Sequence, residues 1–347
     1  MKQEAIIKGF LQLGKLMVSL GEEREWQDFN LGVTKNEYEQ LQLVVSRQIA
    51  YNGWFTKESV QQSLLALGMQ LTEEQLTEWA GTYSFTEKPK SVALIMAGNI
   101  PLVGFHDFLS TLVSGHKVIC KLSSDDKSLL PALAEHLISF VPELKERIVL
   151  TTGRLEGIEA VIATGSDNSL KYFEQYFGKY PHIFRSNRTS LAVFTGNETK
   201  EHIEALGSDV FNYFGLGCRN VSHVLFPKGF EISRFFEGIF GYSNVISNNK
   251  YGNNYDYNKT VYLMNQSPLL DNNFVLLRET ELLFSPLAMI HYHFYENEQE
   301  VTKYIESHKD QIQVVVGGKY TPFGDAQRPK LNDYADGVDT MKWLSEL

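Results

Sequence analysis

Cys218 is the residue of this sequence whose type and surroundings best suit covalent chemistry. It stands in the segment FGLGCRNVSHVLFP, between a turn that contains Gly215 and Gly217 and an apolar run typical of a strand. A thiolate at such a turn can attack a carbonyl carbon, and converging backbone amides can stabilise the developing oxyanion. The alternative is a buried cysteine that packs as a small apolar side chain.

Two further candidates follow apolar runs that are typical of buried strands. Asn99 lies in the turn Gly98-Asn99-Ile100-Pro101 after VALIMA, and Lys121 lies in the run VICKL. Parallel α/β sheets place their ligands at the carboxyl ends of strands. Asn99 could donate a side-chain amide there, and Lys121 could offer a cation to a ribose or phosphate. Taken singly, Asn99 could equally make a turn and Lys121 could be solvated.

Histidines and their neighbours favour structural roles over catalytic ones. His106 and Asp107 could form an acid/base pair, but at a predicted helix start they suit capping better. His223 and the period-two pair His291 and His293 lie on predicted strands. They lack the carboxylate or cysteine spacing of a metal site, so no metal is predicted.

The sequence also suggests roles for the residues next to Cys218 and for the second cysteine, Cys120. Arg219 and Asn220 follow Cys218 directly; they could lower its pKa, bind substrate or simply begin the strand. Cys120 lies inside a predicted buried strand, where a thiol is inert.

Alternating helix and strand patterns position these candidates. Residues 1–85 show apolar residues at helical spacing and predict an all-helical segment. From VALIMA onward, short apolar runs alternate with amphipathic helices up to residue 177, and a second such series begins at SLAVFT. This alternation predicts parallel, doubly wound sheets. The Asn- and Tyr-rich stretch 247–258 is interpreted as a surface loop.

Composition excludes several classes of protein. The 347 residues are 43% hydrophobic and 21% charged, with a net charge of -10, and the 32 Lys and Arg residues are scattered. A nucleic-acid partner is therefore not expected. The sequence lacks the roughly 20-residue apolar stretch of a membrane span and the apolar core of a signal peptide. With only two cysteines, a reducing cytoplasm fits best.

Taken together, the segments resemble the aldehyde dehydrogenase superfamily, and most closely its acyl-CoA reductase branch related to the fatty-acyl reductase of bacterial luminescence. The turn at Asn99 resembles the family's Trp-Asn-Phe-Pro turn. Ser114-Gly115 together with Lys121-Leu122-Ser123-Ser124 resembles its Gly-Asn and Lys-Pro-Ser-Glu segment. Thr164-Gly165-Ser166 resembles its Thr-Gly-Ser segment. Gly217-Cys218 then falls at the family's nucleophile. Glu281, Phe284 and Pro286 resemble Glu-x-Phe-x-Pro with one extra residue, and Pro322-Phe323-Gly324 resembles the late Pro-Phe-Gly. The order is unbroken over residues 88–340.

The resemblance implies a role for each matching position. Cys218 would be the nucleophile, and Asn99 with the Cys218 amide would form the oxyanion hole. Lys121 and Ser123 would lie along the adenosine ribose. Gly165 and Ser166 would lie near the pyrophosphate, and Glu281 against the nicotinamide ribose.

Two departures from the family pattern refine the expected reaction. The stretch Phe184–Arg188 replaces the Glu-Leu-Gly-Gly-Lys segment whose carboxylate activates water in hydrolytic members. The acyl-enzyme should therefore exchange with a thiol such as coenzyme A instead of being hydrolysed. Ser124 stands where NAD-preferring members carry a glutamate, and serine can accept a 2′-phosphate, so NADPH is favoured with NADH as the alternative.

The expected protein is thus an NADPH-dependent reductase that converts an acyl-CoA, such as a fatty acyl thioester, to an aldehyde. Its fold would be aldehyde dehydrogenase-like α/β, with two doubly wound open-sheet domains behind a helical N-terminal segment. The predicted ranges are 1–85 for that segment, 86–189 for the dinucleotide-binding domain, 190–320 for the catalytic thiol domain and 321–347 for a C-terminal segment that could pair protomers. A homodimer is expected, and an acyl-activating partner enzyme is a further candidate. The alternatives are reduction of an acyl phosphate or a protein-delivered acyl group, and a catalytically silent nucleotide-binding protein.

Overall fold

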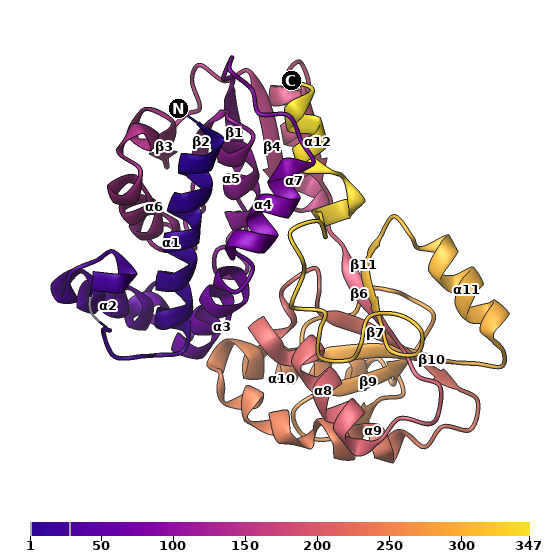
Figure 1. The fold of residues 1–347 in the computed structure, drawn as a ribbon. Helices are drawn as coiled ribbons and strands as arrows, with labels where there is room; N and C mark the ends of the chain where they lie inside the picture. Colours follow the sequence, from indigo (N-terminus) through magenta and orange to yellow (C-terminus); the bar gives the residue numbers. More distant parts are fainter. Residues whose placement is uncertain (1, 28) are drawn as a thin grey trace. The chain divides into compact units, whose positions relative to one another are not determined.

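The computed structural model describes residues 2–27 and 29–347, which form two compact units (Figure 1). The first unit contains the described residues up to Ser186 together with 330–347, and the second contains residues 187–329. Each unit is built around its own mainly parallel sheet. The helical segment predicted for residues 1–85 belongs to the first unit, as does the end of the chain.

The first unit has a five-stranded parallel sheet in the order β3-β2-β1-β4-β5. The strands are β1 (Ser91–Ile95), β2 (Lys117–Lys121), β3 (Ile148–Thr151), β4 (Ala160–Thr164) and β5 (His182–Arg185). The connecting helices are α5 (Phe105–Val113), α6 (Leu129–Phe140), the 3-10 turn η2 (Pro142–Glu146) and α7 (Asp167–Phe177). The chain winds outward from β1 in both directions, so the strand order reverses between β1 and β4, which is where doubly wound sheets generally bind their ligands.

Four helices precede this sheet, in agreement with the sequence prediction. They are α1 (Gln3–Gly21), α2 (Lys35–Tyr51), α3 (Lys57–Gly68) and α4 (Glu73–Gly81), with the turn η1 (Phe29–Leu31) between the first two. The apolar face of α1 is buried, including Ile6, Phe10 and Leu13. Threonines 34, 56 and 72 cap α2, α3 and α4 through side-chain oxygens that accept backbone N–H groups.

The chain returns to the first unit at Lys330 and completes its core. The turn η5 (Ala335–Gly337) and helix α12 (Thr340–Ser345) follow, and α12 packs against α5. Met341 and Leu344 are fully buried in the same apolar cluster as the N-terminal helices. The last residues of the chain are therefore part of the first unit's interior.

The second unit has a six-stranded sheet in the order β11-β6-β7-β10-β9-β8, in which only the short β8 is antiparallel to its neighbour. The strands are β6 (Thr189–Val193), β7 (Val221–Pro227), β8 (Leu270–Asp271), β9 (Leu276–Glu279), β10 (Met289–Tyr295) and β11 (Ile312–Val316). The helical elements are α8 (Lys200–Phe211), η3 (Asn212–Gly215), α9 (Ile232–Ile239), η4 (Phe240–Ser247), α10 (Asn249–Met264) and α11 (Glu298–Ser307). The strands β5, β8 and β9 and the helix α9 were not predicted from the sequence.

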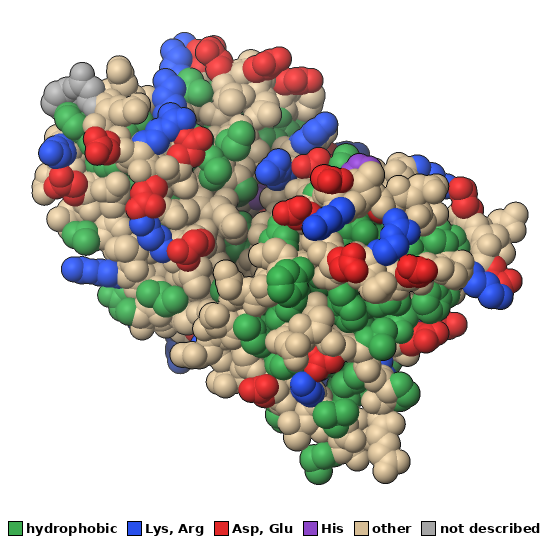
Figure 2. All heavy atoms as spheres, turned by 90° about the horizontal axis from the view of Figure 1, so that it is seen from below, with side chains coloured by type: hydrophobic (Ala, Val, Ile, Leu, Met, Phe, Trp, Pro, Cys, Tyr) green, Lys and Arg blue, Asp and Glu red, His purple; other side chains and the backbone are tan. Residues whose placement is uncertain are grey.

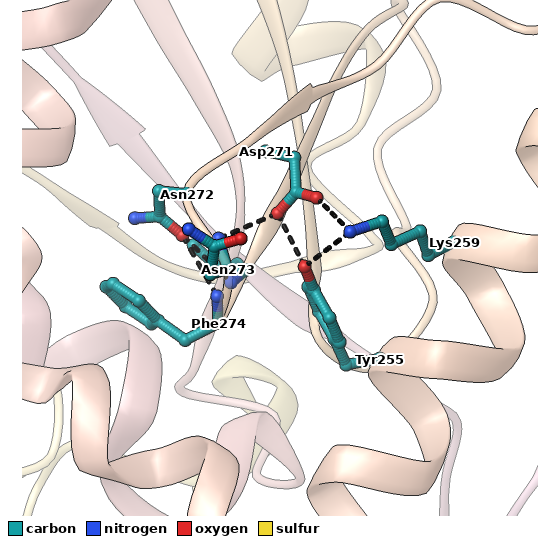
Figure 3. A network of polar contacts seen from close by, with 7 residues as sticks. Tyr255, Lys259, Asp271, Asn272, Asn273 and Phe274 are labelled. Atoms are coloured by element: carbon teal, nitrogen blue, oxygen red, sulfur yellow. Dashed lines mark hydrogen bonds and ion pairs between the residues drawn. The ribbon is translucent and has the colours of Figure 1, made fainter.

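The prediction of a surface loop at residues 247–258 is wrong, because helix α10 covers most of this stretch. Asn248 caps the helix through its side-chain oxygen, which accepts the N–H groups of Lys250 and Tyr251. Tyr255 and Lys259 then bind Asp271 at the sheet edge (Figure 3). Capping and tertiary contacts override the poor helix propensity of a run of asparagines and tyrosines.

On the face drawn in Figure 2, acidic and basic side chains are interspersed, without a wide patch of one sign. Within residues 2–27 and 29–347, no helix combines the length and the apolar character that crossing a bilayer requires.

Candidate active site

The first sheet brings six of the predicted site residues to one edge. Asn99 follows β1, Ser123 and Ser124 follow β2, and Gly165 and Ser166 follow β4. These three strands are neighbours in the order β2-β1-β4, and all of them are parallel. Lys121, the last residue of β2, is the register partner of Ile95 at the end of β1. This edge is where a doubly wound sheet holds its ligand.

The turn that carries Asn99 is tightly held, while Asn99 itself is exposed. Gly98 packs so closely on the loop after β2 that an added Cβ would clash with Ser123 Oγ. Ser63 on α3 donates to the Pro101 carbonyl at 2.8 Å. Asp126 accepts the Leu102 N–H at 2.9 Å. The turn is therefore supported both from the helical segment and from the loop after β2.

The candidate nucleotide-binding residues differ in how they are engaged. Lys121 is not simply solvated, because its Nζ donates to the carbonyls of Thr152 (2.9 Å) and Gly153 (2.5 Å) at the end of β3. Ser166 is the N-cap of α7, which starts at this edge of the sheet. Ser124 is exposed. Exposed hydroxyls, a lysine and a helix N-terminus form a donor set that fits the phosphates and ribose of a dinucleotide.

His106 and Asp107 have structural partners. Asp107 is buried and forms an ion pair with Arg185, with Oδ2 and Nη1 2.5 Å apart. Arg185 also donates to Thr340 Oγ1 at 2.9 Å. His106 Nε2 lies 2.9 Å from the Leu331 carbonyl, so both residues tie α5 to the end of the chain.

Cys218 ends a strained loop of the second unit and is half-buried. Three consecutive residues, Tyr213, Phe214 and Gly215, have φ values of 53°, 58° and 81°. The left-handed region is unfavourable for the two aromatic residues, and such strain is typical of functional sites. By contrast, Cys120 is fully buried in β2, and burial raises the pKa of its thiol.

Asn220 holds this loop together. Its side-chain oxygen accepts the Gly217 N–H at 2.8 Å. Its Nδ2 donates to the carbonyls of Asp209 (3.0 Å) and Asn212 (2.8 Å) at the end of α8. Asn220 therefore fixes the backbone on both sides of the turn.

A cavity of about 250 Å³ adjoins the same loop within the second unit. Most of its lining is apolar and comes from the 210–216 segment, from α10 and from the residues before β10, with Phe214, Leu216, Tyr251 and Leu287 among them. Cys218 precedes β7, and the 281–288 loop precedes the neighbouring parallel strand β10. Both therefore lie at the amino ends of adjacent strands.

Glu281 lies in that loop, with its side chain exposed. Its backbone carbonyl accepts a hydrogen bond from Tyr304 on α11 at 2.9 Å. The Pro322–Gly324 segment is tied to α8, because Asp209 accepts the Gly324 N–H at 2.6 Å and the Ala326 N–H at 3.0 Å.

The supporting residues were missed by the sequence prediction. Ser63 and Asp126 support the Asn99 turn, and Asp209 supports the Pro-Phe-Gly segment. None has a sequence signal of its own, although Asp126 ends the run Ser123-Ser124-Asp125-Asp126. Among the described residues, no group of three or more His, Cys, Asp or Glu side chains is arranged to hold a metal ion.

Comparison with models of known protein families shows to which family this chain belongs. Residues 29–232, more than half of the chain, match the family described as acyl-CoA reductase (LuxC). The chain belongs to the acyl-CoA reductase (LuxC) family. A search of curated proteins found no match to this LuxC-family chain.

Solved structures similar to this LuxC-family chain include several aldehyde dehydrogenases. An indole-3-acetaldehyde dehydrogenase of P. syringae, solved with NAD+ and IAA, has a TM-score of 0.62 and 11% identity over 90% of this chain and 71% of that one. KauB from Pseudomonas aeruginosa has a TM-score of 0.63 and 12% identity, covering 91% and 72%. Substrate-bound AldH of Staphylococcus aureus has a TM-score of 0.55 and 12% identity, covering 91% and 76%. At such identities the likeness concerns the fold. The predicted fold class and family are confirmed.

Proposed function

We propose that this LuxC-family protein reduces an acyl-CoA to an aldehyde with NADPH, through a thioester on Cys218. The observation that supports it most is the position of Cys218. This half-buried thiol ends a strained, side-chain-fixed loop and lies on the same sheet edge as an apolar cavity. In a family of acyl-CoA reductases, that arrangement suits a nucleophile next to an acyl chain.

The first half-reaction transfers the acyl group to the protein. The Cys218 thiolate attacks the thioester carbonyl, and the tetrahedral intermediate carries a negative charge on oxygen. The Cys218 amide and the exposed side-chain amide of Asn99 are the proposed donors to this oxyanion. The carbonyl then reforms, the bond to the coenzyme A sulfur breaks, and coenzyme A leaves as a thiolate that takes a proton from water.

The acyl-enzyme must then resist hydrolysis. The Phe184–Arg188 stretch, which replaces the water-activating segment of hydrolytic relatives, carries no carboxylate. Its Arg185 side chain is buried in an ion pair with Asp107, so neither of these two side chains is available as a general base. The thioester on Cys218 therefore persists until reduction releases the aldehyde.

The nucleotide-binding part of the proposal rests on the polar edge of the first sheet. The dinucleotide, when bound, supplies the reducing equivalent for the acyl group. Lys121, Ser123 and Ser124 would hold its adenosine ribose, Gly165 and Ser166 its pyrophosphate, and Glu281 its nicotinamide ribose. Ser124 has no charge to repel a 2′-phosphate, which favours NADPH. Asp125, the next residue, is an exposed carboxylate, so NADH is the alternative to be tested.

Three related proposals accompany the reaction. The protein would act as a homodimer in the cytoplasm, where its thiols stay reduced. The acyl group could instead come from an acyl phosphate or from an acyl-activating partner enzyme, because a cysteine nucleophile accepts acyl groups from either source. A catalytically silent nucleotide-binding protein is the competing hypothesis.

Intact-protein mass spectrometry would test the proposal. Wild type is mixed with acyl-CoA of graded chain length, or with acyl phosphate, in the absence of nucleotide. We expect a mass increase equal to the acyl group, located on Cys218 by peptide mapping and lost on addition of NADPH as aldehyde appears. Cys218→Ala should lose both the adduct and the reaction. Cys120→Ala, which removes the chain's other thiol, should keep both.

Two outcomes would contradict the proposal. Full activity in Cys218→Ala would exclude the covalent route. Slow labelling of wild-type Cys218 by iodoacetamide at neutral pH, with no acyl adduct from any donor, would instead favour the silent binding protein.

A further inference from the structure

The loop that carries Glu281 is held by side chains of neighbouring elements. Residues 280–288 run between β9 and β10 without forming a helix or strand. The three consecutive carbonyls of Glu281, Leu282 and Leu283 each accept hydrogen bonds from side chains outside the loop. The conformation of this loop therefore depends on those donors, which we call the 281–283 clamp: Ser222, His223, His291 and Tyr304.

Two histidines of the clamp converge on one carbonyl. His223 on β7 and His291 on β10 are register partners, and their Nδ1 atoms lie 2.9 Å and 2.8 Å from the Leu282 oxygen. A carbonyl oxygen only accepts, so both rings must carry their proton on Nδ1. Leu282 is thus fixed from two adjacent strands.

The histidines are kept in this neutral form by their surroundings. Burial lowers the pKa of His223 to about 3 and also lowers the pKa of His291. His223 Nε2 lies 2.8 Å from His293 Nδ1, and with its own proton on Nδ1 it accepts from that atom. His291 Nε2 is buried without a hydrogen-bond partner among the described residues. The network therefore serves to donate to Leu282.

Tyr304 and Ser222 fix the two flanking carbonyls. The Tyr304 hydroxyl donates to the Glu281 carbonyl at 2.9 Å, and the Ser222 hydroxyl donates to Leu283 at 3.1 Å. Burial raises the pKa of Tyr304, so its hydroxyl remains a donor.

The clamp supports a surface rather than a core. Glu281, Leu282 and Phe284 are exposed, although His223 and His291 of the clamp are buried. Burying two neutral histidines, His223 and His291, is costly, because each polar atom must find a partner or lose its hydration. An arrangement that fixes the main chain while exposing the side chains suits a loop that presents a ligand contact.

We propose that Tyr304, His223 and His291 are positioning residues that hold Glu281 where its carboxylate meets the nicotinamide ribose. This inference rests on the proposed function, because it assigns the clamp to the nucleotide half of that site. Acyl transfer to Cys218 requires no nucleotide. Residues 285–288 of the same loop line the apolar cavity, so loss of the clamp should weaken nucleotide binding and reduction more than it slows acylation.

Tyr304→Phe is the sharpest test, because it removes one hydroxyl and keeps the ring. We expect the dissociation constant for NADPH, measured by nucleotide fluorescence, to rise roughly fivefold, as the loss of one neutral hydrogen bond predicts. Hydrogen exchange at the amides of residues 281–287 should become faster in the protein without nucleotide. The rate of acyl adduct formation from acyl-CoA should fall by a smaller factor than the NADPH affinity.

Tyr295→Phe is the matched control. Its hydroxyl donates to the Phe194 carbonyl at 2.6 Å, so it also loses one bond to a main-chain oxygen of the second unit, but outside the 281–283 clamp. We expect wild-type NADPH affinity and wild-type exchange at residues 281–287 in this variant.

Two substitutions of His291 distinguish its role as a hydrogen-bond donor from its role in filling space. His291→Leu removes the donor and should raise the NADPH dissociation constant at least as much as Tyr304→Phe. His291→Asn can place an amide N–H near the Nδ1 position and should recover most of the affinity. Recovery by asparagine would be unexplained if the histidine only filled space.

Several results would overturn the inference. Tyr304→Phe with the same NADPH affinity as Tyr295→Phe would remove the clamp's role while the proposed function stands. Equal losses of acylation and nucleotide affinity would show general damage to the unit. If wild type itself is neither acylated nor binds NADPH, the proposed function fails and the inference with it.

Discussion

Asp126 connects the turn that carries Asn99 to the loop after β2 at the cost of burying a carboxylate. Its Oδ2 accepts the Leu102 N–H, while its Oδ1 is buried without a partner among the described residues. Burial raises its pKa to about 6. A residue that supports the proposed oxyanion donor therefore titrates within an experimentally accessible range.

The sign of the resulting pH dependence follows from linkage. The unfolded chain titrates this carboxyl near pH 4, whereas the folded protein retains the proton up to about pH 6. The stabilising contribution is complete below pH 4 and is lost as the pH rises through 6. We expect the unfolding free energy of wild type, relative to Asp126→Asn, to fall by roughly 3 kcal/mol between pH 4 and pH 7. Urea denaturation across that range measures it.

Asp125→Asn is the control for this prediction, because it makes the same change in charge at the adjacent exposed position. If the two variants differ from wild type by the same amount at every pH, burial of Asp126 does not govern the effect.

Helix α10 shows how a few contacts can build an element that its own sequence disfavours. Asp271 Oδ2 lies 2.7 Å from Lys259 Nζ, and Asp271 Oδ1 accepts from the Tyr255 hydroxyl at 2.6 Å (Figure 3). Tyr255 and Lys259 are one helical turn apart, so a single carboxylate binds both. The contact fixes the helix that contributes Tyr251 to the apolar cavity.

Asp271→Asn should weaken this helix without unfolding the unit. The ion pair is partly exposed, so its loss should cost about 1 kcal/mol, and less at high salt. Hydrogen exchange of the α10 amides and urea unfolding at two salt concentrations measure the effect. Asp256→Asn, an exposed acidic position on the same helix, should change neither. A salt-independent loss would point to packing instead of charge.

The contrast between α10 and β1 shows what sequence patterns can and cannot predict. The run VALIMA predicted β1 because a strand buried on both faces needs continuous apolar residues. The stretch 247–258 has no such pattern, and its helix depends on Asn248 and on Asp271, which lies outside it. Long-range partners of this kind are invisible to a local pattern.

The candidate site divides in the same way. Asn99, Ser123 and Gly165 could be brought together from the sequence because parallel strands share an edge for their carboxyl ends. The groups that support the loops of the site could not be predicted from the sequence. Ser63 and Asp126 support the turn of Asn99, and the 281–283 clamp supports the loop of Glu281. Each binds backbone carbonyls or amides that only the folded chain brings within range. Their identity depends on geometry and leaves no spacing in the sequence.

At the scale of the whole chain, the first unit is made from two separated pieces. The chain leaves this unit after Ser186 and returns at Lys330. The returning piece supplies Thr340 to Arg185, and its Leu344 carbonyl lies 2.8 Å from His116 Nε2. Leu344 itself is fully buried in the apolar cluster that contains α1 and α5. We therefore expect folding of the first unit to require residues that follow the whole of the second.

Leu344→Ala tests this dependence. Removing a fully buried leucine should destabilise the first unit by about 2 to 5 kcal/mol. Hydrogen exchange should accelerate at the amides of β1 to β5, with those of β6 to β11 as the internal reference. Leu206→Ala, at a fully buried leucine of α8, should produce the reverse pattern because it belongs to the second core. If exchange accelerates equally in both sheets for either variant, the two cores unfold together. If exchange in β1 to β5 is unchanged in Leu344→Ala, the end of the chain only covers the first unit.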